Sequence, residues 1–256
     1  MNIKKILILL SGIFLFAHLA ISQPEIIAHR GFWNTEKSAQ NSIKAMKLAD
    51  KAKVYGSEFD VILTRDGVPV VNHDPEIEGF NIEETNYETL KNLRLSNGEK
   101  LPTLKKFLTQ GRRNQFTRLI LEIKPHRSEK NELRAVETIV KMVKNSLVTG
   151  KVDYISFSLF ICEELRRLSP ESEIYYLNGD LSPEEIYDLG FTGLDYNSKV
   201  FLENPDWIER ARELGLKTNV WTVNNEEQMI RFMDMGVDFI TTDNPLLLKE
   251  IIMSEY

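Results

Sequence analysis

The sequence predicts an α/β fold, a (β/α)8 TIM barrel with a small insertion after the second strand. Short runs rich in β-branched and aromatic residues alternate with longer segments of helical period, as in proteins built from βα units around a parallel sheet. We count eight such runs, the number of strands that closes this barrel. Because no Pro-, Gly- or Ser-rich linker divides the chain, one domain is favoured over two. A doubly wound open sheet is the structural alternative.

The composition is typical of a soluble globular protein and argues against a nucleic-acid partner. The 256 residues are 42% hydrophobic and 27% charged, with a formal net charge of -6. Duplex binding relies on clustered Lys and Arg, and no basic stripe is visible. The single cysteine, Cys162, has apolar neighbours at helical spacing, so we expect a buried, inert thiol. The composition leaves the oligomeric state open.

The first 22 residues have the three parts of a secretory signal peptide. Two lysines precede an apolar run over residues 6–16, and Ala20-Ile21-Ser22 offers a small-residue cleavage site before Gln23. The apolar run is short for a membrane span, which needs roughly 20 apolar residues. We therefore expect export to the periplasm or the extracellular space, a mature barrel domain over residues 23–256, and no stable membrane insertion after cleavage. An uncleaved anchor is the alternative.

The eight predicted strands follow one another along the mature chain. In order they cover Glu25–His29, Tyr55–Ile62, Arg118–Lys124, Asp153–Phe157, Glu173–Leu177, Thr192–Tyr196, Lys217–Val223 and Val237–Thr241. Some helices between them have clear boundaries. Ser182 caps a helix with Pro183 at its first position, and Gly190 follows its last turn. A second helix opens at Asn204-Pro205-Asp206 and ends before Gly215.

Residues 74–103 interrupt this alternation of strands and helices. The stretch is rich in Glu and Asn, holds a short amphipathic piece around Tyr87 to Leu93, and ends at Leu101-Pro102-Thr103. We expect it to form the insertion after the second strand.

Three carboxylates on predicted strands form a candidate metal site. The period of two along a strand points Glu58 and Asp60 to the same side. Glu122, in Leu121-Glu122-Ile123-Lys124 on the neighbouring strand, would add a third carboxylate, and like charges this close need a cation or protons. Oxygen-only ligands favour Mg²⁺ or Ca²⁺ over zinc. The plainer alternative is a solvated strand end, or ion pairs with Arg30 and Lys124.

Two histidines end consecutive strand segments and are candidates for acid–base catalysis. His29 ends the first predicted strand, and His73 lies in Asn72-His73-Asp74, after the continuation of the second. Imidazoles with a pKa of about 6.5 can move protons near neutral pH, so a pair flanking a metal-bound phosphodiester can act as base and acid. Arg30 and Lys124 would stabilise phosphate charge. The plainer alternative makes each histidine a core or loop residue.

Two further residues carry less weight. Trp221, in Val220-Trp221-Thr222-Val223, can line the barrel mouth and pack on an apolar part of a substrate, although an aromatic on a barrel strand is more often core. His126 follows Lys124-Pro125, so we expect it in a loop and rank it below the other two histidines.

These motifs resemble the signature of the glycerophosphodiester phosphodiesterase family. The matching residues are His29-Arg30-Gly31, Glu58-x-Asp60, His73-Asp74 and Leu121-Glu122-Ile123-Lys124. The stretch from Val220 to Asp238, followed by Thr241-Thr242-Asp243-Asn244-Pro245, also resembles the last two βα units of the family. The resemblance implies a TIM barrel with a small insertion after the second strand. It further implies a divalent cation on Glu58, Asp60 and Glu122, an acid–base pair of His29 and His73, phosphate contacts from Arg30 and Lys124, and a pocket lined by Trp221.

One position departs from the family pattern. The family commonly has Glu-Asn-Thr after the first strand, whereas this chain reads Gln40-Asn41-Ser42. Gln40 still accepts and donates hydrogen bonds, so it can orient Arg30 while the local charge changes by one unit. The departure bears on substrate preference.

The expected activity is metal-dependent hydrolysis of small-molecule glycerophosphodiesters, the deacylated phospholipids, to glycerol phosphate and an alcohol. A phospholipase-like activity on intact lipids is one alternative, but the sequence has no basic amphipathic helix suited to a membrane surface. A catalytically inactive phosphodiester-binding barrel is the other, but such a barrel should have lost a site residue and none is missing. The headgroup, the choice of cation and the role of each histidine stay open.

Overall fold

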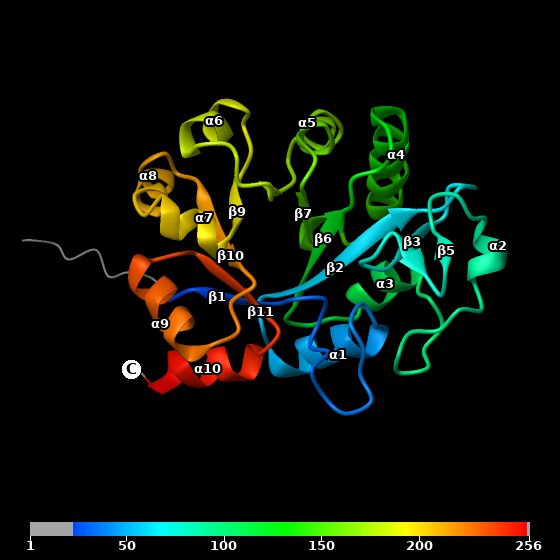
Figure 1. Ribbon diagram of the computed structural model, residues 1–256, viewed down its shortest axis with the longest axis horizontal. Coiled ribbons are helices and arrows are strands. Elements are labelled where there is room, and N and C mark those ends of the chain that lie inside the picture. The colour runs from blue at the N-terminus through cyan, green and yellow to red at the C-terminus, as the bar shows by residue number, and fades with distance from the viewer. Residues whose placement is uncertain (1–22, 255–256) are drawn as a thin grey trace, which may run out of the picture.

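The barrel closes through pairing between the first strand and both its neighbours. The computed structural model describes residues 23–254, so the predicted signal peptide lies outside the described residues. Strand β1 (Glu25–Ala28) pairs in parallel with β11 (Phe239–Thr242) on one side and with β2 (Gly56–Leu63) on the other. Eight parallel strands thus form a closed ring with helices outside (Figure 1). This confirms the predicted TIM barrel and excludes the doubly wound sheet.

All eight predicted strands are present, with ends shifted by one or two residues. The remaining strands are β3 (Pro69–Val71), β4 (Glu76–Ile77), β5 (Phe80–Asn81), β6 (Arg118–Ile123), β7 (Val152–Ser156), β8 (Ile174–Tyr176), β9 (Gly193–Asn197) and β10 (Lys217–Trp221). The helices are α1 (Ile43–Ala52), α2 (Tyr87–Leu90), α3 (Leu104–Gly111), α4 (Glu129–Asn145), η1 (Thr149–Lys151), α5 (Leu159–Leu168), α6 (Pro183–Asp188), α7 (Ser198–Glu203), α8 (Trp207–Glu213), α9 (Glu226–Met235) and α10 (Pro245–Ser254).

Two helix boundaries test the predicted start signals. Helix α6 begins at Pro183, and Ser182 and Glu185 bond reciprocally to each other's backbone N–H groups, as predicted for a capped start. The second prediction, a helix opened by Asn204-Pro205-Asp206 that ends before Gly215, is confirmed: α8 begins at Trp207, directly after Asp206, and ends at Glu213. Asn204 itself caps the end of the preceding helix α7. The residue before a proline is disfavoured in the helical conformation, which accounts for the break between the two helices at Asn204.

Successive side chains of β2 point alternately to the outside and to the inside of the barrel. Phe59 faces outward and packs on Phe107 of α3, with ring centroids 4.7 Å apart. The main core, between barrel and helices, contains both rings. A second, smaller cluster of buried apolar residues includes Ile120 and Ile155. Glu58 and Asp60, on the opposite side of β2 from Phe59, therefore point into the barrel.

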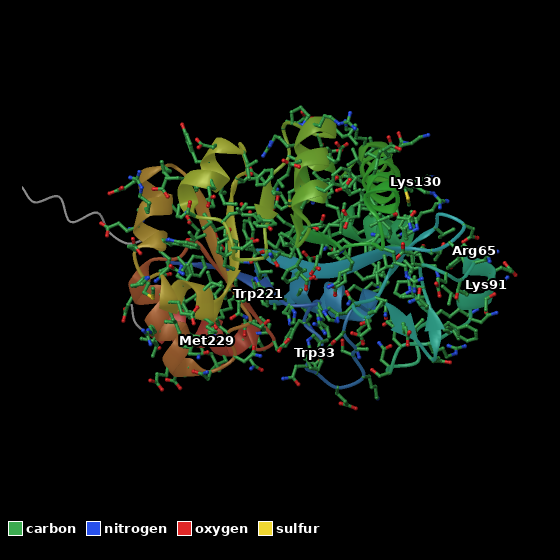
Figure 2. The ribbon with its side chains drawn as sticks, turned by 45° about the horizontal axis from the view of Figure 1, so that its top comes forward. Trp33, Arg65, Lys91, Lys130, Trp221 and Met229 are labelled. Carbon is green, nitrogen blue, oxygen red and sulfur yellow. The ribbon has the colours of Figure 1, made fainter. Side chains whose placement is uncertain are left out.

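The insertion has a small core of its own. Strand β3 pairs antiparallel with β2, β4 and β5 form a two-stranded sheet, and the segment then returns to α3. Ile62 and Val70 pack with Ile82, Leu90 and Leu101. Figure 1 shows the insertion at one edge of the barrel, and the labelled Arg65 and Lys91 lie at that edge in Figure 2. Within residues 23–254, no helix combines the length and the apolar character that crossing a membrane requires.

Candidate active site

The turn after β1 connects the first strand to the acidic side chains of the second. Arg30 has a φ of 53° and Gly31 a φ of 80°, so the chain reverses sharply after His29. A Cβ atom at position 31 would lie 2.7 Å from the Cβ of Ala45 in α1, so the close packing on this helix requires glycine. The tight turn aims the Arg30 backbone N–H at Glu58, and it donates to Oε2 at 2.6 Å.

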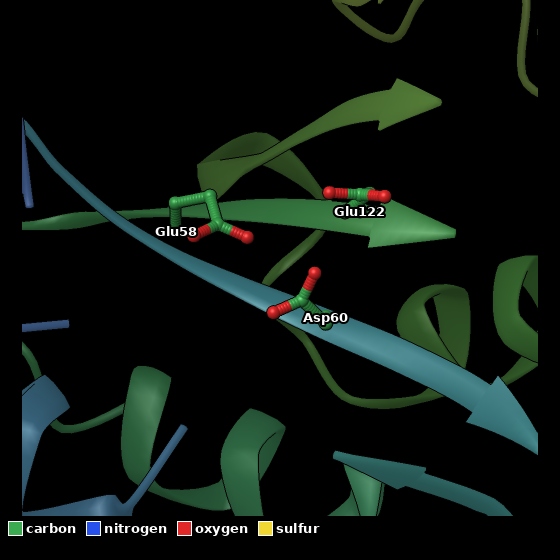
Figure 3. A group of neighbouring side chains, drawn as sticks. All are labelled: Glu58, Asp60 and Glu122. Carbon is green, nitrogen blue, oxygen red and sulfur yellow. The ribbon is translucent and has the colours of Figure 1, made fainter. Parts of the chain in front are cut away.

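Three buried carboxylates converge from two neighbouring strands. Asp60 of β2 is the register partner of Glu122 of β6, and Glu58 lies one inward position earlier on β2. One oxygen from each residue lies within 4.8 Å of the others (Figure 3). Relative exposure is only 4% for Glu58, 1% for Asp60 and 6% for Glu122, so these are not solvated strand ends. Glu58 Oε1 is buried without a hydrogen-bond partner.

The three carboxyl groups differ in how readily they ionise. Burial raises the pKa of Glu58 well above its usual value, and the charges of Asp60 and Glu122 raise it further. Burial and the charge of Asp60 raise the pKa of Glu122 to about 8. Burial also acts to raise the pKa of Asp60, but the positive charges around it, that of Lys124 foremost, and the hydrogen bond from Asn41 together outweigh burial and lower this pKa. Asp60 therefore carries the firmest negative charge of the cluster.

Lys124 and Arg30 provide the positive charge of the site. Lys124 Nζ lies 3.3 Å from Asp60 Oδ1 and 2.8 Å from Glu122 Oε1. The Arg30 Nε atom lies 3.9 Å from Asp60 Oδ2, and its guanidinium donates to Gln40 Oε1 at 2.7 Å. Gln40 thus holds Arg30 in place even though it carries no charge.

Asn41 is a site residue that the sequence reasoning missed. Its Nδ2 donates to Asp60 Oδ2 at 2.8 Å, and its Oδ1 accepts from the Asp60 backbone N–H at 3.1 Å. Asn41 has a φ of 59°, a left-handed conformation that asparagine tolerates better than most residues. The sequence signal that could have identified Asn41 was its position next to Gln40, in the segment that departs from the family pattern. Asn41 fixes both the backbone and the carboxylate of Asp60.

Each of the two candidate histidines contacts an aspartate through Nδ1. His29 Nδ1 lies 2.9 Å from Asp243 Oδ1, and His73 Nδ1 lies 2.7 Å from Asp74 Oδ1. Burial lowers the pKa of His73. Asp243, in the loop after β11, is a second residue that sequence reasoning gave no role.

Most of the predicted site residues line one cavity of about 110 Å³. They are His29, Arg30, Glu58, His73, Glu122 and Trp221. Asp60 and Lys124 do not line this cavity. They pair with each other, and Lys124 also pairs with Glu122, which does line it. Apolar side chains also line the cavity, among them Phe157, whose ring meets Trp221 edge-on with the centroids 5.6 Å apart. Trp221 is anchored because its Nε1 donates to the Asp195 carbonyl at 2.8 Å; Figure 2 labels it.

A wider groove of about 820 Å³ lies next to this cavity. Its lining comes from the loop over residues 33–40 and from the insertion, at residues 76–78 and 94–96. Asn72 and Asp74 line the groove, whereas His73 between them lines the cavity. His73 therefore lies at the junction of the two spaces.

His126 and Cys162 have structural surroundings. His126 bonds through Nδ1 to the Lys124 carbonyl at 2.8 Å, and its Nε2 accepts from the Leu63 backbone N–H at 3.1 Å. Both ring nitrogens are thus engaged by backbone, in the loop after β6. Cys162 is fully buried in α5, and burial raises the pKa of its thiol. Neither side chain lines the cavity.

Cleavage of a phosphate diester requires neutralised phosphate charge and groups that move protons to and from oxygen. The cavity at the barrel mouth brings both kinds of group together, which defines a phosphodiester hydrolase built on a TIM barrel. The sequence model of the Glycerophosphoryl diester phosphodiesterase family matches residues 29–247. The chain belongs to this family and is an enzyme, a phosphoric diester hydrolase.

Relatives cover nearly the whole chain. A protein named Glycerophosphodiester phosphodiesterase from Caldanaerobacter subterraneus subsp. tengcongensis is 28% identical over 250 residues, 89% of this chain and 97% of the relative. A crystal structure of a glycerophosphodiester phosphodiesterase from Parabacteroides distasonis is 48% identical with a TM-score of 0.90, covering 91% of this chain and 98% of that one. An Oleispira antarctica phosphodiesterase, solved with the product sn-glycerol-3-phosphate, shares the fold at 24% identity and a TM-score of 0.79, covering 90% and 97%.

Proposed function

We propose that this enzyme hydrolyses glycerophosphodiesters to glycerol phosphate and an alcohol, using a divalent cation and the imidazoles of His29 and His73. The observation that carries the proposal is the single cavity in which both imidazoles, Arg30 and two of the three clustered carboxylates meet. Membership of the family supports the substrate class.

The carboxylate cluster suits a hard divalent cation. Glu58, Asp60 and Glu122 offer only oxygen ligands, which Mg²⁺ and Ca²⁺ prefer, and Glu58 Oε1 is buried with no hydrogen bond to satisfy it. Lys124 and Arg30 leave this oxygen unpaired, so ion pairing alone does not explain the cluster. When bound, such an ion polarises a phosphoryl oxygen and neutralises its charge.

The side chains of the cavity perform the remaining steps. One imidazole takes the proton of the attacking hydroxyl, which belongs to water or to the glycerol of the substrate. When the glycerol hydroxyl attacks, a cyclic glycerol phosphate forms first, and a water molecule then opens it to glycerol phosphate. The other gives a proton to the leaving alkoxide as its P–O bond breaks. Arg30 and Lys124 stabilise the negative charge that gathers on the phosphoryl oxygens. Trp221 packs against the carbon atoms of the glycerol.

Purified protein should release glycerol phosphate from glycerophosphocholine and glycerophosphoethanolamine. We expect EDTA to abolish the activity, Mg²⁺ or Ca²⁺ to restore it, and His29→Ala or Glu58→Ala to remove it. Glu137→Ala is the control, because Glu137 is exposed on α4 and should leave turnover unchanged. Activity that survives EDTA and both substitutions would refute the mechanism. Cleavage of intact phospholipids only would favour the phospholipase-like alternative, and no cleavage at all the binding role.

We further propose that residues 1–22 are a signal peptide and that residues 23–256 form the exported mature domain. The charged, apolar and small-residue parts of the N-terminus support this. Cell fractionation with N-terminal sequencing should find a protein that begins at Gln23 outside the cytoplasm. An intact Met1 in the cytoplasmic fraction would contradict the proposal.

A further inference from the structure

The carboxylate of Asp243 is held on both of its oxygens. Oδ1 accepts from Trp33 Nε1 at 3.1 Å and contacts His29 Nδ1 at 2.9 Å. Oδ2 accepts from Asn224 Nδ2 at 2.7 Å, and the Asp243 backbone N–H donates to Asn224 Oδ1 at 2.8 Å. These partners come from the segment after β1 and from the loop after β10. The carboxylate therefore has little freedom to turn away from the imidazole.

This arrangement decides which nitrogen of His29 carries the proton. Hydrogen bonds from His29, Asn224 and Trp33, with the charge of His29, lower the pKa of Asp243 even though burial acts to raise it. An ionised carboxylate can only accept hydrogen bonds, so His29 Nδ1 must be the donor. The other ring nitrogen, Nε2, is then the one left for the cavity that His29 lines.

The second histidine–aspartate contact is built differently. The side chain of Asp74 is 75% exposed, compared with 21% for Asp243, and the imidazole of His73 is 37% exposed, compared with 20% for His29. Water competes for the carboxylate in the exposed pair, so that contact orients its imidazole weakly. The histidine–aspartate contact is therefore firmly held at His29 and loose at His73.

We propose that Asp243 is a positioning residue for the phosphodiesterase reaction: it locks His29 in the Nδ1–H tautomer and presents Nε2 to the phosphodiester. Its effect on turnover rests on the proposed function, because it acts through His29. As the base, neutral His29 accepts the proton at Nε2; as the acid, the doubly protonated ring donates from Nε2 and keeps its Nδ1–H on Asp243. Trp33 and Asn224 hold Asp243 in turn.

Asp243→Asn is the decisive variant because it preserves shape. Its side-chain amide can donate to Nδ1 and so favour the opposite tautomer. In a Ser-His-Asp protease this change lowers kcat about 10⁴-fold. Here we expect kcat to fall about 10²- to 10⁴-fold, with KM changing less than about threefold. Asp243→Glu should recover part of the loss. The matched change Asp74→Asn should lower kcat by at most about fivefold, because Asp74 is largely exposed.

Long-range proton–nitrogen NMR correlations of the histidine rings report the tautomer of His29 directly. This tautomer would not change if Asp243 had only a structural role. We expect the His29 ring, assigned with His29→Ala, to be the Nδ1–H tautomer in the wild-type protein and to shift towards Nε2–H in Asp243→Asn. An unchanged tautomer in a folded Asp243→Asn protein would overturn the proposal, as would a kcat within about threefold of wild type. The spectra need no substrate. A wild-type protein without diesterase activity would therefore refute the proposed function, while the tautomer still decides the role of Asp243.

Discussion

Replacing Asp195 tests how much the buried charges of the barrel cost in stability. Asp195 lies on β9, lines the candidate active-site cavity, and is only 2% exposed. Asn219 Nδ2 donates to its Oδ1 at 2.7 Å, but this neutral partner does not offset burial. Burial raises the pKa of Asp195 from 3.8 to about 7. At about 1.4 kcal/mol per tenfold change in proton affinity, this corresponds to roughly 4 kcal/mol of folding free energy.

The direction of the pH dependence follows from where the proton is held more tightly. Below about pH 4 the carboxyl group is protonated in both the folded and the unfolded chain, and its charge costs nothing. Between about pH 4 and about pH 7 the folded chain binds more protons than the unfolded chain, so this carboxyl lowers the stability as pH rises. Asp195→Asn removes the titration. Its free energy of unfolding relative to wild type should therefore rise by roughly 4 kcal/mol across this range and then level off.

Urea denaturation across this pH range measures the difference directly. Asp153→Asn is the matched control, because Asp153 is also a buried barrel carboxylate but accepts from Arg118 Nε at 2.9 Å. Its removal leaves the guanidinium without its partner, so this variant should be less stable than wild type. If Asp195→Asn were no more stable than wild type at about pH 8, or if the difference did not depend on pH, the reasoning about burial would be refuted.

Three further substitutions test the site and its support. Asn41→Ala removes both hydrogen bonds to Asp60, so we expect about 1–3 kcal/mol lower stability by denaturation and at least about tenfold lower kcat. Asn41→Gly, which retains the backbone freedom, should behave alike, and wild-type turnover in either variant would contradict this role. Gln40→Glu adds a negative charge beside Arg30, so inhibition by added glycerol phosphate, the proposed product, should weaken about fivefold, at about 1 kcal/mol for neighbouring charges in water; unchanged inhibition would count against a phosphate site there. Phe59→Ala should lower stability by about 3–5 kcal/mol in the same denaturation assay, because this ring is fully buried against α3, and a loss under about 1 kcal/mol would contradict the packing.

The three clustered carboxylates were predictable because their arrangement is largely local. Alternation along β2 alone puts Glu58 and Asp60 on one side and Phe59 on the other, and the structure has this arrangement. Glu122 needed one more assumption, that its strand is the neighbour of β2, and the register pairs it with Asp60. The cavity then gathers Glu58, Glu122 and Trp221 from predicted strands and His29 from the end of one, whereas Arg30 and His73 lie in segments that follow strands.

Asn41 and Asp243 could not be predicted in the same way. Asn41 reaches Asp60 through a left-handed turn after β1, and no periodic pattern reports such a turn. Asp243 is 214 residues from His29 in the chain, and the two meet only because β1 pairs with β11. Likewise, the small core of the insertion joins Ile62 and Leu101, which alternation does not connect.

The sequence by itself determined the number and order of the strands, the side of β2 on which the carboxylates lie, and the resemblance that led to the family. These features follow from residue periodicity and motif order, which are local properties of the chain. Only the tertiary structure decided that the barrel closes between β1 and β11, and that Asp243 thereby anchors His29 while Asp74 leaves His73 exposed. Such contacts depend on strand pairing and on packing between distant segments, so no local pattern in the sequence encodes them.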